Sequence, residues 1–405
     1  MNIKNLFILE VLKTFSLNSW LYIWNFSRYN FVEHLLEDLV KCNILFVKIY
    51  QALASNTIAI DKRYIKYLKK YTDHVPYTTL TNDKKIINDL GFNFDQTTLI
   101  NSGTIAIVYK TIYKNKDVII KIKREELFLK QEFEKMVFLC KLLSYIPILW
   151  NFNLTNVIET NRELILNQLD FKKEVSNIKT MQNIHRRIDY IKIPIVYEEF
   201  TDKNNDVIVM EYLYGNTIYK VDPSDYKNYA LLFSQFGIKS LLFDGIYHAD
   251  LHPGNIIFMK NNKTNKNILG IIDFGIVNHI TKEEQNNYFL FYKYLNNKFE
   301  LAKHIIYNMS YKENKQEQLS ENKKEKLIYE IREVVYIFNK KLTFDDILKI
   351  SNILKKYDYK LCNYFYKLLL GLVSCEGTMN YLTNNKNNLE LLNETFQKMY
   401  NHLLI

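Results

Sequence analysis

The sequence predicts a mixed α+β protein of two lobes, a small β-rich N-lobe and a mainly helical C-lobe, after an N-terminal helical extension. Three observations lead to this fold class. Apolar residues recur at helical spacing in residues 1–82, β-branched residues and a turn follow in 98–123, and helical patterns dominate the last half of the chain. We therefore expect three domains, 1–82, 83–215 and 216–405, with a ligand bound in the cleft between the lobes.

The composition is that of a folded globular protein. Of the 405 residues, 48% are hydrophobic and 24% are charged, which excludes a wholly disordered chain. The ten glycines and five prolines are too few for a collagen-like chain or for most all-β folds, which need many tight turns. The net charge of +10 permits anionic partners, but no basic stripe with interleaved aromatic residues is present, so we expect no nucleic acid.

The sequence also bears on compartment and partners. The four cysteines are far apart and form no CxxC pair, which predicts free thiols in a reducing compartment rather than a zinc site. The apolar N-terminal stretch is interrupted by Glu10 and Lys13 and has no cleavage site, so we expect no signal peptide, transit peptide or transmembrane helix. We expect a protein that is soluble or peripheral to a membrane, with its aromatic N-terminal helices as the candidate contact for lipid or protein partners.

The first half of the chain is expected to form the extension and the N-lobe. Residues 35–47 place leucines and valines at helical spacing. Residues 98–123 predict two or three strands with a hairpin turn at 114–117, and residues 125–184 return to a helical pattern. The short apolar run Val207–Met210 predicts one further strand at the end of this lobe.

The second half is expected to be helical around one hairpin. Residues 226–243 have a helical pattern, and the apolar runs 255–259 and 268–272 flank a polar loop, as in a β-hairpin. Beyond residue 281 the pattern is again helical. We expect the Lys-, Glu- and Asn-rich stretch 310–326 to be a loop.

The segment His248–Asn255 carries the strongest chemical signal. Asp250 stands five residues before Asn255, at the start of an apolar strand, and Asp273 follows a second apolar strand as the first residue of Asp-Phe-Gly. Phosphoryl transfer needs this set: one carboxylate orients or deprotonates the acceptor, while an asparagine and a second carboxylate hold Mg²⁺. Either aspartate alone is also explained as a loop cap or turn residue, but the order and spacing together match the kinase signature.

Lys121 lies in the apolar run that precedes this segment. A lysine that faces an enclosed cleft needs anionic partners, and the phosphates of ATP together with a carboxylate would supply them. Glu174, in the helical pattern that follows, is the best candidate for that carboxylate. By itself Lys121 is also explained as a solvated strand residue, because Lys123 shares its face.

Two further segments are candidates for nucleotide contacts. Glu211 and Leu213 follow an apolar strand, where backbone groups could bind adenine, although an ordinary strand end explains them equally well. A loop about eighteen residues before Lys121 has only one glycine, which makes it a weak phosphate motif. Its candidate residues are Ser102, Gly103, Thr104 and Ala106.

With these motifs the chain resembles the UbiB/ADCK family of atypical protein-kinase-like proteins. Lys48-Ile49-Tyr50-Gln51 resembles the family's KxGQ motif, and Gln168-Leu169-Asp170 resembles its ExD motif. The loop 102–106 is similar to the family's alanine-rich loop, and His248–Asn255 with the Asp-Phe-Gly segment completes the set.

The resemblance implies a bilobal protein-kinase-like fold with a docked N-terminal helical extension. It also implies Mg-ATP as ligand, ATP hydrolysis favoured over protein phosphorylation, and a link to ubiquinone or isoprenoid-lipid metabolism. Lys48, Gln51 and Asp170 are then expected beside the nucleotide. Two departures, Tyr50 for glycine and Gln168 for glutamate, alter the elements that cover the protein-substrate site in the family.

Three functions remain open from the sequence. The favoured one is an Mg-ATP-dependent ATPase or atypical kinase, in which Lys121 binds phosphates, Glu174 positions Lys121, and Asp250 orients the nucleophile. The second is a protein kinase or a small-molecule phosphotransferase of the aminoglycoside or choline type, which lacks a counterpart of Lys48 and Gln51. The third is a catalytically weak, nucleotide-sensing scaffold, which the altered KxGQ and ExD motifs favour.

Overall fold

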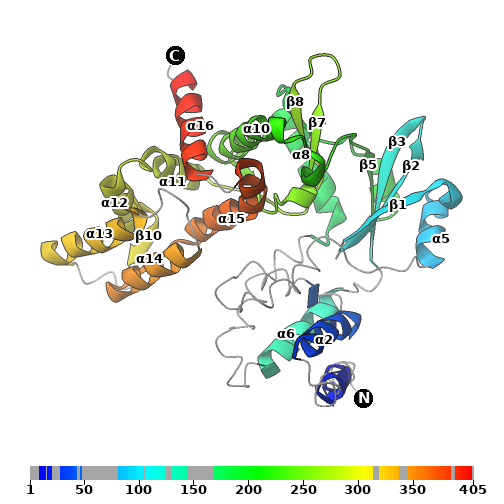
Figure 1. The fold of residues 1–405 in the computed structure, drawn as a ribbon, viewed down its shortest axis with the longest axis horizontal. Helices are drawn as coiled ribbons and strands as arrows, with labels where there is room; N and C mark the ends of the chain where they lie inside the picture. The colour runs from blue at the N-terminus through cyan, green and yellow to red at the C-terminus, as the bar shows by residue number, and fades with distance from the viewer. Residues whose placement is uncertain are drawn as a thin grey trace. The chain divides into compact units, whose positions relative to one another are not determined.

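The computed structural model shows two compact units (Figure 1). The first unit comprises Met1–Val175 and Ile195–Tyr212, and the second comprises Ser176–Pro194 and Leu213–Ile405. The structure describes residues 9–14, 16–20, 28–42, 46–47, 81–103, 105–124, 129–143, 168–312, 319–336, 344–384 and 388–403.

The first unit is built on a four-stranded antiparallel sheet in the order β1-β2-β3-β5. A two-residue turn joins β2 to β3, and its residues Lys114 and Asn115 both have positive φ, as a tight hairpin with right-handed strand twist requires. The turn is thus shorter than the expected 114–117, because Lys116 already pairs with Tyr113. The strands are β1 (Thr98–Ser102), β2 (Ala106–Tyr113), β3 (Lys116–Lys123) and β5 (Val207–Glu211).

The two faces of this sheet are covered by different helices. Alternate residues of β3, such as Ile120 and Ile122, join a core that includes Ile87 of α5 and Phe200 of α9. The opposite face packs Ala106 and Ile208 against Phe171 and Val175 of α8. The helices of this unit within the described residues include α2 (Arg28–Cys42), α5 (Thr81–Asp89), α6 (Leu129–Leu143), the start of α8 (Phe171–His185) and α9 (Glu198–Lys203).

Among the described residues, the second unit has three small β-sheets beside its helices, two of which lie near the segment 248–275. As predicted, two apolar runs form an antiparallel hairpin, β7 (Ile256–Lys260) and β8 (Asn267–Ile271). The short strand β4 (Ile191–Lys192) pairs parallel with β8, and β6 (Ile246–His248) pairs antiparallel with β9 (Val277–His279).

Gly215 fits the close approach of the chain to this hairpin. A Cβ atom at this position would lie 2.6 Å from the Phe258 carbonyl oxygen, and Asn216 makes a pair of backbone hydrogen bonds with Phe258. A side chain at residue 215 would therefore push the segment off the hairpin.

Helices form the rest of the second unit, and their apolar faces make one large core. Its centre includes Tyr288, Phe291, Ile305, Ile331 and Phe365, all of which are buried. The helices are α10 (Tyr226–Lys239) with the π-helical turn η5 (Ser240–Asp244), α11 (Lys282–Lys293), α12 (Lys298–Asn308), α13 (Glu321–Tyr336), α14 (Phe344–Lys356), α15 (Asn363–Thr383) and α16 (Asn388–Leu403).

The expectation of a loop over 310–326 is wrong at both ends. Ser310–Lys312 forms strand β10, which pairs antiparallel with β11 (Tyr359–Leu361). Helix α13 already begins at Glu321. Its first turns are polar because they face solvent, while Leu327 and Ile331 supply the buried contacts further on.

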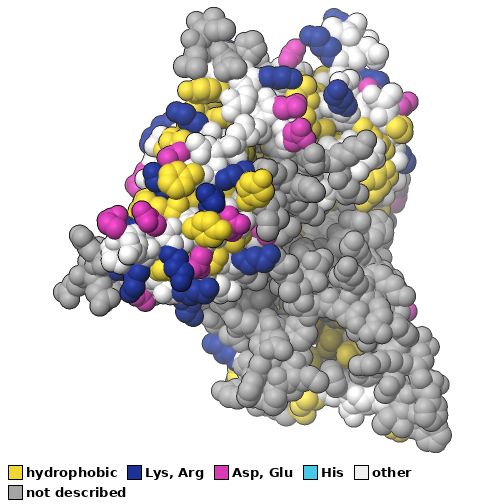
Figure 2. Space-filling model, turned by 60° about the vertical axis from the view of Figure 1, so that its left-hand side comes forward, with side chains coloured by type: hydrophobic (Ala, Val, Ile, Leu, Met, Phe, Trp, Pro, Cys, Tyr) yellow, Lys and Arg dark blue, Asp and Glu magenta, His cyan; other side chains and the backbone are white. Residues whose placement is uncertain are grey.

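Helices α12 and α13 each carry an exposed aromatic side chain that makes a cation–π contact with a basic side chain of the same helix. The Lys303 ammonium lies 4.6 Å from the Phe299 ring centroid, and the Arg332 guanidinium lies 5.0 Å from that of Tyr329. On the face shown in Figure 2, hydrophobic side chains stand among basic and acidic ones rather than in one continuous patch. In the parts of the chain that are described, no helix combines the length and the apolarity needed to cross a bilayer.

Buried histidines predict a loss of stability in acid. Burial lowers the pKa of His185 and of His304, so both stay neutral in the folded protein, whereas in the unfolded chain they take up protons below about pH 6.5. Unfolding then binds protons, and the free energy of unfolding should fall as the pH drops below about 6.5. Urea unfolding of wild type and His304→Gln at several pH values measures this. An unchanged pH slope in His304→Gln would contradict the assignment.

Candidate active site

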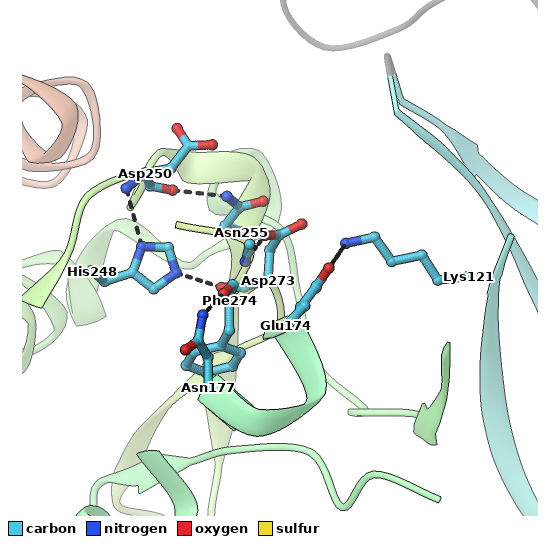
Figure 3. Close-up of polar contacts among 9 residues, drawn as sticks. Lys121, Glu174, Asn177, His248, Asp250, Asn255, Asp273 and Phe274 are labelled. Atoms are coloured by element: carbon cyan, nitrogen blue, oxygen red, sulfur yellow. Dashed lines mark hydrogen bonds and ion pairs between the residues drawn. The ribbon is translucent and has the colours of Figure 1, made fainter. Parts of the chain in front are cut away.

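In the first unit, β3 and α8 bring Lys121 and Glu174 into a buried ion pair (Figure 3). The Lys121 ammonium lies 2.8 Å and 2.9 Å from the two carboxylate oxygens of Glu174. The Glu174 side chain is 1% exposed and that of Lys121 is 11% exposed. Separating two ions that water hardly reaches would leave each charge buried and uncompensated, at a high cost in free energy. The pair therefore holds α8 in one register against the sheet.

Local sequence explains how the pair forms. Side chains alternate along β3, so Ile120 and Ile122 enter one core while Lys121 faces the side that packs against α8. At the start of α8, the Asp170 carboxylate accepts a hydrogen bond from the Lys173 backbone N–H, as a helix N-cap does. Glu174 then follows one turn into the helix.

Arg124, the residue after β3, holds the loop between β1 and β2. Its Nε donates to the Gly103 carbonyl at 2.9 Å, and its Nη2 donates to the Ser102 hydroxyl at 2.6 Å. The Gly103 N–H donates to the Ala106 carbonyl, which closes the loop on itself. Thr104, also expected in this loop, lies outside the described residues.

In the second unit, a short loop after β6 carries Asp250 and Asn255. The Asn255 Nδ2 donates to the Asp250 carbonyl at 2.8 Å, and the Asp250 N–H donates to His248 Nδ1 at 3.2 Å. Both backbone polar groups of Asp250 are therefore fixed, and with them the start of its side chain (Figure 3). The turn preceding β6 ends at Gly245, whose φ of +69° suits glycine.

The Asp-Phe-Gly segment is held by hydrogen bonds from three directions. The Gly275 N–H donates to Asp273 Oδ1 at 3.0 Å, and His248 Nε2 donates to the Asp273 carbonyl. The next carbonyl, that of Phe274, accepts a bond of 2.9 Å from the Asn177 amide of α8. Phe274 itself is completely buried.

His248 acts in this network as a neutral ring. Its Nδ1 accepts from a backbone N–H, so the proton sits on Nε2, the nitrogen that donates to Asp273. Burial lowers the pKa of His248, which keeps the ring uncharged and fits both bonds. The residue is a brace of the loop rather than a metal ligand.

Asn255 and Asp273 supply a donor set that fits Mg²⁺. The Asn255 nitrogen donates to a carbonyl, so Oδ1 is the atom that can bind a cation, and Asp273 adds carboxylate oxygen. Mg²⁺ prefers oxygen ligands and commonly takes only one or two carboxylates, with water and phosphate completing its shell. Among the residues that the structure describes, no cluster of three His, Cys, Asp or Glu side chains offers a different metal site.

The other residues predicted to contact the nucleotide either make contacts that stabilise the fold or lie outside the residues that the structure describes. The Glu211 carboxylate accepts from the Ile195 N–H at 3.0 Å, at the end of β5. Leu213 is buried, with a methyl group 2.9 Å from the ideal Cβ position of Gly270. Lys48 and Gln51 lie outside the described residues, so the described contacts of Asp170 are those of a helix cap.

The sequence did not predict the supporting roles of Arg124 and Asn177. Arg124 ends a basic run in which Lys121 was the obvious candidate, and nothing in that run signals its bonds back to residues 102–103. Asn177 stands three residues after Glu174 on one helix, and this spacing was a usable signal. Its partner is 97 residues further along the chain, which no local pattern predicts.

The four-stranded sheet, the lysine–glutamate pair and the Asp-Asn and Asp-Phe-Gly segments define a kinase-like α+β domain. The profile of the ABC1 atypical kinase-like domain matches residues 79–304, more than half of the chain, and the chain belongs to this family. The resemblance to the UbiB/ADCK family is thereby confirmed.

Named relatives agree with this assignment. The chain is 27% identical over 254 residues to the probable serine/threonine-protein kinase abkB of Dictyostelium discoideum, across 58% of this chain and 37% of that protein. It is 29% identical over 209 residues to the probable protein kinase UbiB of Glaesserella parasuis, across 48% and 37%. With the mouse AarF domain-containing protein kinase 1 the identity is 21% over 257 residues, across 60% and 48%. The chain thus spans less than half the length of these relatives.

A solved structure supports the fold alone. The complex of Rv3197 with erythromycin from Mycobacterium tuberculosis has a TM-score of 0.50 and 16% sequence identity, across 85% of this chain and 89% of that one. The likeness extends beyond residues 79–304, the part that the family profile matches.

Breaking the buried ion pair should destabilise the protein more than removing it whole. Lys121→Met leaves the Glu174 carboxylate buried without its cation, and we expect a loss of about 3 kcal/mol in the free energy of unfolding. The double variant Lys121→Met/Glu174→Gln should recover most of that loss. Denaturant unfolding of wild type, both single variants and the double variant measures the coupling; additive losses would contradict a mutually dependent pair.

Proposed function

We propose that this protein binds Mg-ATP and acts as an ATPase or atypical kinase. One observation supports the proposal most: the Lys121–Glu174 pair holds a nearly buried ammonium, and kinase-type phosphoryl transfer uses such a lysine to bind phosphates. An apolar pair could hold α8 on the sheet without the desolvation cost of two buried charges, so the charged pair favours an additional role in binding an anion. The family assignment supports kinase-type chemistry at the coarse level, and ATP binding and turnover are the proposal's own.

The residues divide the work as follows. Lys121 holds the α- and β-phosphates, and Glu174 holds Lys121 in place. Asn255 Oδ1 and Asp273 would hold Mg²⁺, which when bound neutralises charge on the phosphate oxygens. Asp250 orients the attacking hydroxyl or water and accepts its proton, with its backbone fixed by His248 and Asn255.

The names of the relatives support a proposal for the metabolic context in which the phosphate acceptor would be found. Several of the relatives are named UbiB, which supports a place in ubiquinone or isoprenoid-lipid metabolism. The chain spans only 37% of those proteins, so this link concerns the domain that is shared. Rapid phosphorylation of generic proteins, or of an aminoglycoside or choline, would favour the second candidate function instead.

Mg²⁺-dependent ATP binding tests the proposal directly. Wild type should gain about 2.7 kcal/mol of stability at an ATP concentration one hundred times its dissociation constant. Lys121→Ala and Asp273→Asn should lose this gain, whereas Asp250→Asn should keep the binding and lose turnover. Thermal shift with and without Mg²⁺, beside an ATP hydrolysis assay, measures both. A folded wild type without any shift would mean a closed or inactive nucleotide site and would favour the scaffold function.

The N-terminal helical residues support a second part of the proposal, contact with a lipid surface. Leu9, Leu12, Leu17 and Trp20 are large hydrophobic residues, and more than half of each side chain is exposed. Leu9 and Leu12, like Leu17 and Trp20, are three residues apart in helical segments, a spacing that puts both members on one side.

Vesicle binding tests that contact. Wild type should float with phosphatidylcholine vesicles that contain an anionic lipid, and Leu17→Ser/Trp20→Ser should bind several-fold less because the apolar area is lost. Tyr336→Ser, which removes an exposed aromatic ring from the other unit, is the matched control. Equal flotation of both variants would contradict a role of the N-terminal residues.

A further inference from the structure

Helix α8 is the element that carries one member of each group of site residues. Glu174 binds Lys121 within the first unit, and Asn177 binds the Phe274 carbonyl within the second (Figure 3). The two residues are three positions apart, so their side chains leave the helix on neighbouring sides, one turn from each other. Each of the two residues makes its contact within its own unit.

The bond from Asn177 completes the support of the backbone around Asp273. The N–H of Ile272 donates to the Asn255 carbonyl at 3.1 Å, and the Ile276 carbonyl accepts from the Ala249 N–H at 3.0 Å. His248 donates to the Asp273 carbonyl. These three partners belong to the segment 248–255. The bond to the Phe274 carbonyl is the one in this set that comes from α8.

The hydrogen bond from Asn177 to the Phe274 carbonyl requires an amide donor at residue 177. Asn177 is 8% exposed and Phe274 is 0% exposed, so water competes little for the carbonyl, and the donor–acceptor distance is 2.9 Å. Aspartate at this position would aim a carboxylate at a carbonyl oxygen, and leucine would leave that carbonyl without this donor.

We infer that Asn177 is a positioning residue that orients the Asp273 carboxylate through its hydrogen bond to the Phe274 carbonyl. The inference rests on the proposed function. A peptide carbonyl fixed one residue after Asp273 limits rotation of the backbone from which that carboxylate projects. Support of this kind behind a metal ligand commonly changes metal affinity about 10- to 100-fold when it is removed.

The experiment compares Asn177→Leu with Asn287→Leu in the full chain. Asn287 is a matched control because it is 6% exposed, lies in the second unit and donates through Nδ2 to the Tyr364 hydroxyl at 3.1 Å. Both variants lose one buried amide bond. Only Asn177→Leu should raise the Mg²⁺ concentration for half-maximal ATP-dependent stabilisation, by about tenfold.

A second readout needs neither metal nor nucleotide. Hydrogen exchange of the free protein should quicken in the peptides that contain residues 273–275 and α8 in Asn177→Leu, and stay at the wild-type rate there in Asn287→Leu. Asn177→Asp, which keeps the side-chain volume and removes the donor, should behave like Asn177→Leu and serves if the leucine variant does not fold.

The outcomes separate the inference from the proposed function. If wild type shows no Mg²⁺-dependent ATP binding, the proposed function fails, and the role of Asn177 in orienting a metal ligand fails with it. If wild type binds Mg-ATP but Asn177→Leu needs no more Mg²⁺ than Asn287→Leu, the inference alone is overturned. Equal exchange rates in the two variants at residues 273–275 overturn it as well.

Discussion

The buried ion pair between Lys121 and Glu174 is the constraint on which the first unit depends. Two charges that are almost out of water cannot separate without a large desolvation cost, so β3 and α8 have a fixed register. That register also sets the packing of Phe171 and Val175 on the sheet. In the function that we propose, an ammonium fixed in this way needs no rearrangement when a phosphate arrives.

In the second unit, hydrogen bonds rather than an ion pair hold the candidate site residues in position. His248, Asn255 and Asn177 hold backbone groups of the segments around Asp250 and Asp273, and a neutral His248 is required because it must accept from one N–H and donate to one carbonyl. The carboxylates are therefore oriented through the main chain.

The helical tail extends past the residues that the family profile matches, and it packs against the loop that carries the site. Thr378 of α15 is fully buried, with its hydroxyl 3.5 Å from the Leu251 carbonyl, and the ideal Cβ position of Gly377 lies 3.9 Å from Pro253. Together with α11 to α14, α15 and α16 form the large core of the second unit. The tail thus supports the loop through α15, although its sequence carries no catalytic motif.

The sequence by itself determined the fold class and the family, because these depend on local spacing: alternation around Lys121, five residues from Asp250 to Asn255, and an aspartate before Phe274. The same spacing named the residues that we propose for binding phosphate and metal. Tertiary structure alone decided what supports them. Arg124 reaches back about twenty residues to Ser102, Asn177 reaches 97 residues ahead, and Ser310–Lys312 becomes a strand only because Tyr359–Leu361 lies beside it. Periodicity reports which face of an element is apolar, whereas a hydrogen bond between distant segments depends on how the chain folds back, which no local pattern contains.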